Sequence, residues 1–355
     1  MKNHSNEPQN IQLPPVIFGT SSLGNLYQAI SDESKKEIIS ECIQNARGIP
    51  MFDTAGKYGA GLALEVLGTY LEELKVDPSE VIISNKLGWY QTELKTTGPT
   101  FEQDVWVNLK NDAVQKISYS GILECFEQGN EFLGKYNAQM VSVHDPDEYL
   151  AALEDPMERE KRYNDILDAY KALLELKAQG KVASVGIGSK DWKVIQRICN
   201  DVELDWVMIA NSLTIHSHPP ALIKFIAELK EKNISVINSA VFNGGFLIGS
   251  DHYNYKKINK NTTKGQDLYL WRYKFYAICK KFGVEPAQAC FDFGFNVPGV
   301  KSIALNTSKA ENIKINVEMA EKKVPNGFWE AMYAAQLINL PIEILYKNEN
   351  ASTDL

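Results

Sequence analysis

Short apolar runs alternate with helical patterns along most of this chain, and the alternation limits it to few folds. Eight runs read as β-strands, at residues 16–19, 51–53, 81–84, 140–144, 182–188, 206–210, 235–240 and 302–305. Several are β-branched and apolar throughout, as expected of parallel strands that are covered on both faces. Because crossovers between parallel strands are right-handed, two main arrangements remain, a doubly wound open sheet and a closed barrel of eight strands.

Amphipathic helical patterns occupy the stretches between the strands, most clearly at residues 32–46, 62–74, 166–180 and 222–233. Ser31 or Asp32 can cap the first, and Gly180 suits the position just beyond the end of the third. Polar stretches at 88–118 and 249–265 break the rhythm, and a tail from about 325 holds one further helix. The two interior stretches follow strands, and in a barrel such loops build the active face.

The composition excludes several classes of protein. The 355 residues include 45 acidic and 37 basic side chains, a net charge of −8, which argues against nucleic acid or an anionic membrane as the main partner. No apolar run approaches the roughly 18 residues of a membrane helix, and the polar amino terminus lacks the apolar core of a secretory signal. Five spaced cysteines without a CxxC pair indicate reduced thiols, so we expect a cytoplasmic protein.

Four residues with proton-transfer chemistry lie at or just after the ends of these strands. Asp53 ends the second run and Tyr58 lies in the loop behind it, while Lys86 follows the third run and His144 ends the fourth. The carboxyl ends of successive parallel strands meet at one edge, so these side chains can converge there. Each alone also fits a turn, a cap or an ordinary ion pair. Together they predict proton transfer to or from an alcohol or a carbonyl.

The segments around these residues resemble the aldo-keto reductases. They are FDTAGKYGAGLALEVLG at 52–68, the lysine after the third strand, and VSVHDPD at 141–147. The likeness extends over nearly the whole chain, from GTSSLG at 19–24 to NTSKAENIKIN at 306–316. It implies the (β/α)8 barrel of that family. We therefore expect a TIM barrel as one domain over 1–355, with the barrel at about 13–320 and a C-terminal helix and tail at about 321–355.

Within the family, the chain resembles the bacterial aldose 1-dehydrogenases, which oxidise sugars such as L-fucose or other D-threo-aldoses. The motif HDPD, the segment ISYSG at 117–121 and FNGGFL at 242–247 carry this resemblance. It implies an oxidoreductase of carbohydrate metabolism that turns an aldose into a lactone. Two alternatives stay open: an NADPH-dependent aldehyde or ketone reductase of the same fold, and a non-catalytic, nucleotide-sensing regulatory subunit.

In this interpretation Tyr58 is the general acid/base, Asp53 holds Lys86 protonated, and His144 binds the reacting oxygen. A free phenol has a pKa of about 10, so a catalyst working near neutral pH needs a value about 3 units lower, or about 4 kcal/mol. An ammonium group about 4 Å away supplies about 4 kcal/mol at an effective dielectric constant of about 20. We therefore expect Lys86 to lower the pKa of Tyr58 sufficiently, unless burial of the phenolate opposes it.

The glycine pattern argues against a Rossmann fingerprint as the cofactor site, because GAG at 59–61 and GIG at 186–188 lack a third glycine at the right offset. The resemblance implies instead a nicotinamide dinucleotide, NAD or NADP, extended across the barrel mouth, with backbone amides of residues 242–247 around its pyrophosphate. It assigns the following residues to the cofactor: Gly19, Thr20, Ser189, Phe242, Asn243, Gly244, Gly245, Leu247, Asn306, Ser308, Asn312 and Asn316.

Asparagine replaces the expected cations at the adenosine end. NADP-preferring relatives place a basic residue where this chain has Asn306 and Asn312, so a 2′-phosphate lacks its charge-assisted partners. We therefore expect NAD to be favoured, although Lys309 or Lys314 can substitute for the missing cations. At the nicotinamide end the chain also departs from the family: Gly188 and Ser189 precede Lys190 where Ser-Asn is usual, and Met208 and Ser239 replace a glutamine and an aromatic residue.

The substrate, a small sugar or carbonyl compound, is expected to contact loop residues near Tyr58. The candidates are Leu23, Tyr27, Trp89, Tyr90 and the rest of the stretch 88–118. Aromatic rings beside polar groups suit the face of a sugar. His216 and His218 lie beside prolines, and two histidines alone do not predict a metal site. The sequence does not specify the sugar or the oligomeric state.

Overall fold

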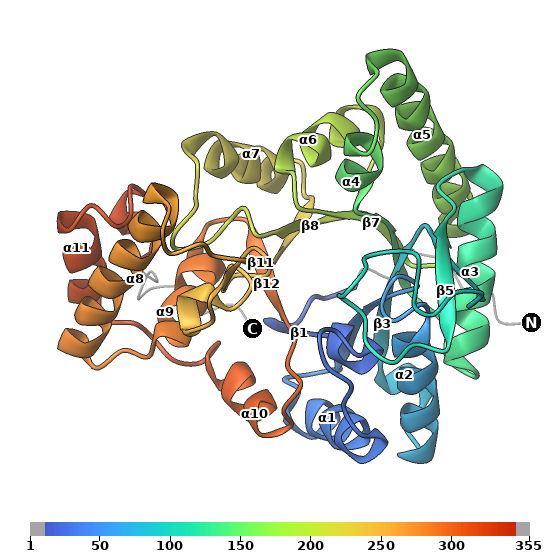
Figure 1. Cartoon of the computed structure of the whole chain (residues 1–355), viewed down its shortest axis with the longest axis horizontal. Coiled ribbons are helices and arrows are strands. Elements are labelled where there is room, and N and C mark those ends of the chain that lie inside the picture. The colour runs from blue at the N-terminus through green and yellow to red at the C-terminus, as the bar shows by residue number, and fades with distance from the viewer. Residues whose placement is uncertain (1–10, 346–355) are drawn as a thin grey trace, which may run out of the picture.

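The structure is a computed structural model that describes residues 11–345. The polar amino terminus at 1–10 and the end of the tail at 346–355 lie outside the described residues. Within residues 11–345, eight parallel strands form a closed barrel surrounded by helices (Figure 1). Their order is β1 (Val16–Gly19), β12 (Val300–Leu305), β9 (Ser235–Ser239), β8 (Trp206–Ala210), β7 (Ser184–Ser189), β6 (Met140–His144), β3 (Ile82–Leu87) and β2 (Met51–Ala55). The predicted barrel is confirmed, and each strand overlaps one of the eight apolar runs.

Helices follow the strands and cover the outside of the barrel. They are α1 (Asp32–Asn45), α2 (Leu62–Glu73), α3 (Tyr119–Leu133), α4 (Pro146–Ala151), α5 (Pro156–Ala178), α6 (Trp192–Asp201), α7 (Pro220–Glu231), α8 (Thr263–Phe282), α9 (Pro286–Asn296), α10 (Glu311–Glu318) and α11 (Asn326–Ala334). Short 3-10 turns are η1 (Ser21–Gly24), η2 (Pro78–Glu80), η3 (Phe246–Ile248) and η4 (Ile342–Ile344).

The predicted helix boundaries hold at α1 and fail at the start of α5. Ser31 caps α1, because its hydroxyl accepts a hydrogen bond from the Ser34 amide at 3.2 Å. Helix α5 begins at Pro156 rather than at residue 166, because the Asp155 carboxylate accepts hydrogen bonds from the amides of its first turn. At the other end Gly180 has φ +71°, as expected of a glycine beyond a helix.

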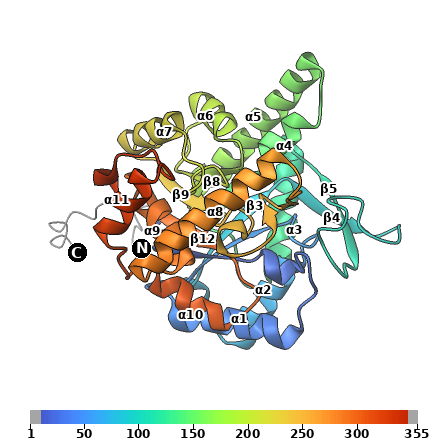
Figure 2. The same cartoon turned by 60° about the vertical axis from the view of Figure 1, so that its left-hand side comes forward.

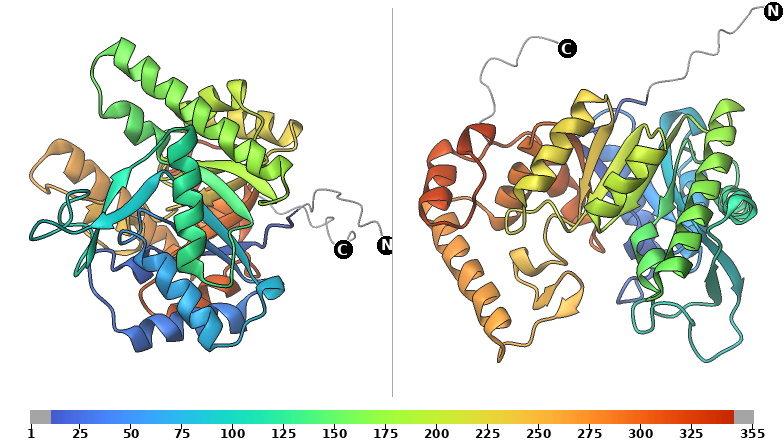
Figure 3. Two further views of the ribbon diagram at one scale, coloured as in Figure 1. Left: turned by 90° about the vertical axis from the view of Figure 1, so that its right-hand side faces the viewer. Right: turned by 90° about the horizontal axis from the view of Figure 1, so that it is seen from above.

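Two insertions extend the barrel at the same end (Figure 3). The predicted loop at 88–118 contains an antiparallel hairpin of β4 (Trp89–Glu93) and β5 (Asn111–Gln115), which projects from the barrel in Figure 2. The stretch 249–265 contains the short pair β10 (His252–Tyr253) and β11 (Lys256–Lys257). Residues 94–110, at the tip of the first hairpin, are called the tip loop below.

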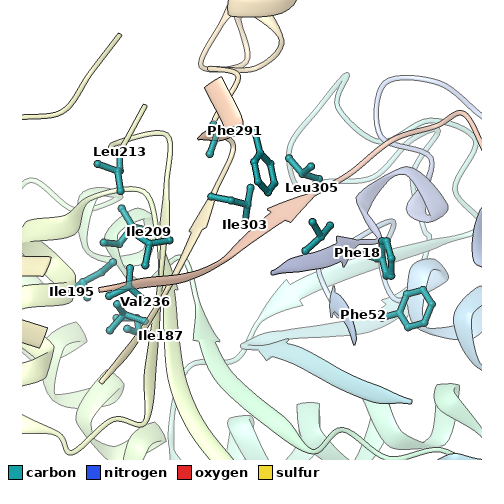
Figure 4. Close-up of a cluster of buried hydrophobic side chains, with 14 of the residues drawn as sticks. Phe18, Phe52, Ile187, Ile195, Ile209, Leu213, Val236, Phe291, Ile303 and Leu305 are labelled. Atoms are coloured by element: carbon teal, nitrogen blue, oxygen red, sulfur yellow. The ribbon is translucent and has the colours of Figure 1, made fainter. Parts of the chain in front are cut away.

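The core has two layers because successive strand residues face opposite sides. Inside the barrel, one cluster gathers Ile17, Met51, Met140, Trp206, Met208, Ile237 and Ala304. Outside it, the alternate residues pack against the helices, and Figure 4 shows part of this layer around Phe18, Ile209 and Ile303. A Cβ on Gly186 would lie 2.2 Å from the Trp206 ring, so glycine makes room for the tryptophan inside the barrel.

Two further findings concern the chain as a whole. No helix within residues 11–345 is both long and apolar enough to cross a membrane. The five cysteines form no disulfide, and four of them are buried. Burial raises the pKa of the Cys125 thiol to about 12, which keeps that group protonated and unreactive.

Candidate active site

The strand register directs three of the four proposed catalytic side chains into the barrel. Met51 faces the barrel interior, so Asp53, two residues later on β2, continues on the same face. On β6 the same rule carries the inward face from Met140 to His144. Lys86 shares the face of Ile82, which packs on the interior cluster. The alternation that builds the barrel core therefore also brings these polar groups together at the carboxyl end.

Lys86 and Asp53 form a buried ion pair at this end. Lys86 Nζ lies 2.5 Å from Asp53 Oδ2 and donates a second hydrogen bond to the Thr54 carbonyl oxygen at 3.2 Å. Both side chains are at most 5% exposed. A Cβ on Gly188 would lie 3.1 Å from Lys86 Cδ, so a glycine on β7 leaves space for the lysine stem. This pairing is the one expected if Asp53 holds the ammonium group in place.

Tyr58 completes the group from the loop after β2. Its ring centroid lies 4.7 Å from Lys86 Nζ and 5.5 Å from the ring of His144, which it meets edge-on. The loop lies against η1: a Cβ on Gly24 would come within 2.7 Å of the Tyr58 carbonyl carbon. Two backbones this close leave the Tyr58 main chain little freedom. The structure therefore brings Asp53, Tyr58, Lys86 and His144 together.

Burial determines the charge states of Tyr58 and His144 in this site. Burial raises the pKa of Tyr58 well above its usual value, the negative charges of Asp53 and Asp145 raise it further, and Lys57 lowers it in part. The condition attached to the prediction therefore decides the outcome: burial opposes the lowering by Lys86, and removal of the phenolate from water outweighs the cations. Burial also lowers the pKa of His144, and the cations around it, Lys86 first, lower it further. Near neutral pH the site holds a protonated phenol and an uncharged imidazole.

These groups lie in a cavity of about 1410 Å³ between the two insertions. Its wall includes the four residues, parts of the tip loop, the glycines after β9 and the β10–β11 segment. Ligand pockets commonly measure about 300–1,000 Å³. The volume therefore accommodates a ligand larger than a single small metabolite.

The residues assigned to the cofactor divide between the cavity and its surroundings. Those that line it are Gly19, Ser189, Phe242, Gly244, Gly245 and Asn306. The remaining assigned residues do not line the cavity: Thr20, Asn243, Leu247, Ser308, Asn312 and Asn316. Two of the second set hydrogen-bond to other residues of the cavity wall: Thr20 Oγ1 donates to the Asp53 carbonyl oxygen at 3.1 Å, and Asn243 Nδ2 donates to Asn254 Oδ1 at 2.8 Å. On α10 and before it, Asn312 and Ser308 bond to Thr307 and Gln28 instead.

Of the expected substrate contacts, Tyr27 lines the cavity but Leu23, Trp89 and Tyr90 do not. Leu23 is buried in the core. Trp89 packs against Phe101 at a centroid distance of 5.3 Å, so its indole contacts the tip loop and does not face the cavity. The ring of Tyr90 contacts Lys116 Nζ at 3.9 Å, outside the cavity.

Further side chains on the cavity wall were not named singly in the prediction, although Trp106 and Glu102 lie in the predicted stretch 88–118. Trp106 of the tip loop lies 5.7 Å from the Tyr58 ring, and Tyr255 joins it on the wall. Asn211 also lines the cavity, with its buried Oδ1 unpartnered among the described residues. An ion cluster of Lys57, Glu102, Asp145, Glu148 and Lys190 borders the same space. A sequence signal existed for Lys57, a lysine that lies between Gly56 and Tyr58.

The two histidines after β8 have hydrogen-bond partners of their own. His216 Nδ1 lies 2.9 Å from the Tyr253 hydroxyl, and His218 Nε2 accepts from the Asn339 amide at 3.1 Å. Within residues 11–345 no three His, Cys, Asp or Glu side chains are arranged to hold a metal ion. The pair therefore joins the β10–β11 segment and the C-terminal segment to the barrel.

Comparison with known proteins agrees with this geometry. A D-threo-aldose 1-dehydrogenase from Pseudomonas sp is 26% identical over 339 residues, 93% of this chain and 96% of the relative. A pyridoxal 4-dehydrogenase from Microbacterium luteolum is 25% identical over 336 residues, 91% of this chain and 94% of the relative.

Solved structures share the fold. A glycerol dehydrogenase from Gluconobacter oxydans superimposes with a TM-score of 0.67 at 15% identity, over 94% of this chain and 96% of that one. The holo form of an aldo-keto reductase from Bacillus halodurans gives 0.63 at 18% identity, over 94% and 92% of the two chains. The model of the aldo/keto reductase family matches residues 15–336, so this chain belongs to that family of oxidoreductases.

Proposed function

We propose that this protein catalyses the NAD-dependent oxidation of an aldose to its lactone, with Tyr58 as the proton-transfer group. The observation that carries the proposal is the convergence of Tyr58, Lys86, Asp53 and His144 on one large cavity. The family supports an oxidoreductase, and the 26% identical relative named for D-threo-aldoses supports a sugar as substrate.

The residues of the chain provide the proton chemistry. The Tyr58 oxygen takes the proton of the anomeric hydroxyl as the carbonyl forms, and the Lys86 ammonium stabilises the phenolate that makes this possible. Asp53 positions Lys86 through the 2.5 Å contact. His144, held uncharged by burial, has a ring N–H or a lone pair for the reacting oxygen. A bound nicotinamide supplies the site that accepts the hydride.

The cavity fits a dinucleotide. Gly244 and Gly245 line it with φ +69° and +89°, a backbone that L side chains rarely adopt and that lets a ligand approach closely, although the Gly245 amide itself donates to the Phe242 carbonyl oxygen at 3.0 Å. The unpartnered Asn211 Oδ1 is an acceptor suited to an amide of the ligand. Lys256, Lys257 and Lys264 line the same cavity from the second insertion and suit phosphate groups. In this proposal Gly19, Ser189, Phe242 and Asn306 complete the cofactor contacts.

We favour NAD over NADP as the cofactor. Asn306, the residue on the cavity wall after β12, has its Oδ1 engaged with the Ser22 amide at 3.0 Å. Lys309 and Lys314, the cations that can substitute, do not line the cavity. A 2′-phosphate near this wall therefore lacks a cationic partner, which costs NADP affinity.

One observation favours a second function, reduction of an aldehyde or ketone with NADPH. The raised pKa of Tyr58 keeps the phenol protonated at neutral pH, and a protonated phenol is the form that a reductase needs as general acid. A regulatory subunit that binds the nucleotide without turnover is a third possibility. In each case we propose that the protein acts in the cytoplasm on small molecules, as a single barrel domain.

One spectrophotometric screen separates these functions. Aldoses and simple alcohols are supplied with NAD and with NADP, and aldehydes and ketones with the reduced cofactors, while nicotinamide absorbance is followed. The proposal expects the highest kcat/KM for an aldose with NAD. A higher value for a carbonyl compound with NADPH selects the reductase, and tight nucleotide binding without turnover selects the regulatory subunit.

A further inference from the structure

Lys57 is the centre of a buried ion cluster beside the proposed reaction centre. Its Nζ lies 2.6 Å from Glu102 Oε1, 2.9 Å from Glu148 Oε2 and 3.3 Å from Asp145 Oδ2, and its side chain is 4% exposed. The three carboxylates come from the tip loop, from α4 and from the residue after β6. One lysine thus joins three strand-end segments.

A second cation pairs with the same carboxylates. Lys190, just after β7, contacts Asp145 Oδ2 at 3.2 Å and also pairs with Glu148. The mutual attraction raises the pKa of both lysines and lowers that of Asp145, so all remain charged near neutral pH. Three carboxylates face two ammonium groups, which leaves one negative charge in excess. The exposed Asp104 adds another on the cavity wall.

The cluster lies next to the groups that handle the reacting oxygen. Asp145 Oδ2 is 3.7 Å from His144 Nε2, and Asp145 has φ +45° in the turn that starts α4. Across the cluster, Glu102 Oε2 accepts a hydrogen bond from Trp106 Nε1 at 2.7 Å, and Trp106 packs on Tyr58. The cluster and the tip loop therefore form the wall that a substrate meets beyond its reacting carbon.

We propose that this wall selects uncharged substrates and excludes those that carry a carboxylate on the part of the molecule beyond the reacting carbon. The inference rests on the proposed function for its sugar substrate, but the charge rule applies to either direction of the reaction. The three lysines of the reaction centre and its cluster are already paired: Lys86 with Asp53, and Lys57 and Lys190 with the cluster. Lys256 and Lys257 of the β10–β11 segment line the same cavity from the second insertion.

A substrate carboxylate that reaches this wall would meet negative charge in excess, and both lysines of the wall are already paired with protein carboxylates. Like charges brought together in a partly desolvated site repel strongly, whereas hydroxyl groups can donate to the same carboxylates. The wall is thus suited to hydroxyl-rich neutral molecules. This selection goes beyond the choice of reaction, because it determines which sugars or aldehydes reach the reaction centre.

The experiment compares substrates that differ in charge alone. The sugar set is a neutral aldohexose, the uronic acid with the same stereocentres, and the methyl ester of that acid. The aldehyde set is 4-carboxybenzaldehyde and its methyl ester, reduced with NADH and NADPH. We expect kcat/KM for each ester to exceed that for its acid by about 10²-fold. Steric exclusion predicts the reverse order, because the ester is larger than the acid.

A double variant tests which residues set the preference. Glu102→Gln with Glu148→Gln converts the cluster to a net positive charge with little change of shape, and should lower the ester-to-acid ratio at least about tenfold. The control, Glu158→Gln with Glu318→Gln, removes two helix carboxylates that do not line the cavity and that pair with Lys161 and Lys322, and should leave the ratio unchanged. Because the measured quantity is the ratio of kcat/KM for ester to kcat/KM for acid, a general loss of activity does not change it.

The outcomes separate the two proposals. Equal kcat/KM for acid and ester overturns the inference, as does an unchanged ratio in the double variant. If no sugar is turned over while the aldehyde set shows the expected ratio, the aldose function fails and the charge rule stands. If sugars are turned over and the uronic acid reacts as fast as its ester, the function stands and the charge rule fails.

Discussion

Lys86 Nζ lies 2.5 Å from Asp53 Oδ2, and both side chains are almost completely removed from water. Lys86→Met leaves the Asp53 carboxylate buried without its cation, which should lower the free energy of unfolding by about 3–5 kcal/mol. Replacing both partners, Asp53→Leu with Lys86→Met, removes the unpaired charge and should recover most of that loss. Urea unfolding measures both variants.

The same two variants separate stability from catalysis. Both should lack turnover, because both remove the ammonium group beside Tyr58. If the double variant is as unstable as Lys86→Met, the pair contributes more than mutual charge compensation. If either variant retains wild-type activity, Lys86 has no part in the chemistry.

The backbone at Gly24 lies so close to that of Tyr58 that a methyl group added at Gly24 should disturb the site. In Gly24→Ala the new Cβ would lie 2.7 Å from the Tyr58 carbonyl carbon, so the loop after β2 must shift. We expect a stability loss of about 1–3 kcal/mol and a fall in kcat. Gly98→Ala is the matched control, since a Cβ there meets nothing within 4 Å. Thermal unfolding and steady-state kinetics of the two variants should differ clearly; similar behaviour would show that the loop adapts without moving the phenol.

The pH dependence of aldose oxidation should follow the ionisation of the Tyr58 phenol. Burial raises the pKa of Tyr58, so the base form is scarce at neutral pH and increases about tenfold per pH unit below that pKa. We predict that kcat/KM for aldose oxidation rises through the alkaline range with a slope near one on logarithmic axes. A flat profile from pH 6 to 10 contradicts this assignment of the base.

The pH dependence of stability should follow the buried histidines. Burial lowers the pKa of His216 to about 4, against about 6.5 for an exposed histidine. Between these values the unfolded chain binds more protons than the folded one, so stability is present above pH 6.5 and is lost as the pH falls toward 4. For His216 the loss is about 3 kcal/mol.

Unfolding free energies at pH 7, 6 and 5 test this linkage. His216→Gln should flatten the decline, whereas the exposed His252→Gln should not change it. An equally steep decline in His216→Gln would assign the acid sensitivity to other groups, such as His144 and His218, whose pKa values burial also lowers.

Local patterns predicted the eight strands and the positions of the proposed catalytic residues, whereas the family resemblance favoured the closed barrel over an open sheet. Strand ends and inward-facing positions follow from alternation, and this locates Asp53, Lys86 and His144. The charge state of Tyr58 depends on burial by Trp106 and other distant residues, which no local pattern reports. Trp89 and Tyr90 were misplaced for a related reason: the β4–β5 hairpin turns them away from the cavity and presents Trp106 instead.

The ion cluster was missed because its members are separated in sequence. Lys57, Glu102 and Glu148 lie on three different connections, and only closure of the barrel brings them together. Single charged residues in loops usually indicate a solvated surface. Only the folded structure shows which of these loop residues lie within ion-pair distance of one another.

The most direct test of the account is the turnover of Tyr58→Phe, which removes one hydroxyl and leaves the ring packed against Trp106 and His144. We predict that kcat falls about 10²–10⁴-fold while the dissociation constant of the nicotinamide cofactor, measured by fluorescence titration, stays within about threefold. A variant that keeps wild-type kcat with its cofactor bound would contradict the assignment of Tyr58 as the proton-transfer group.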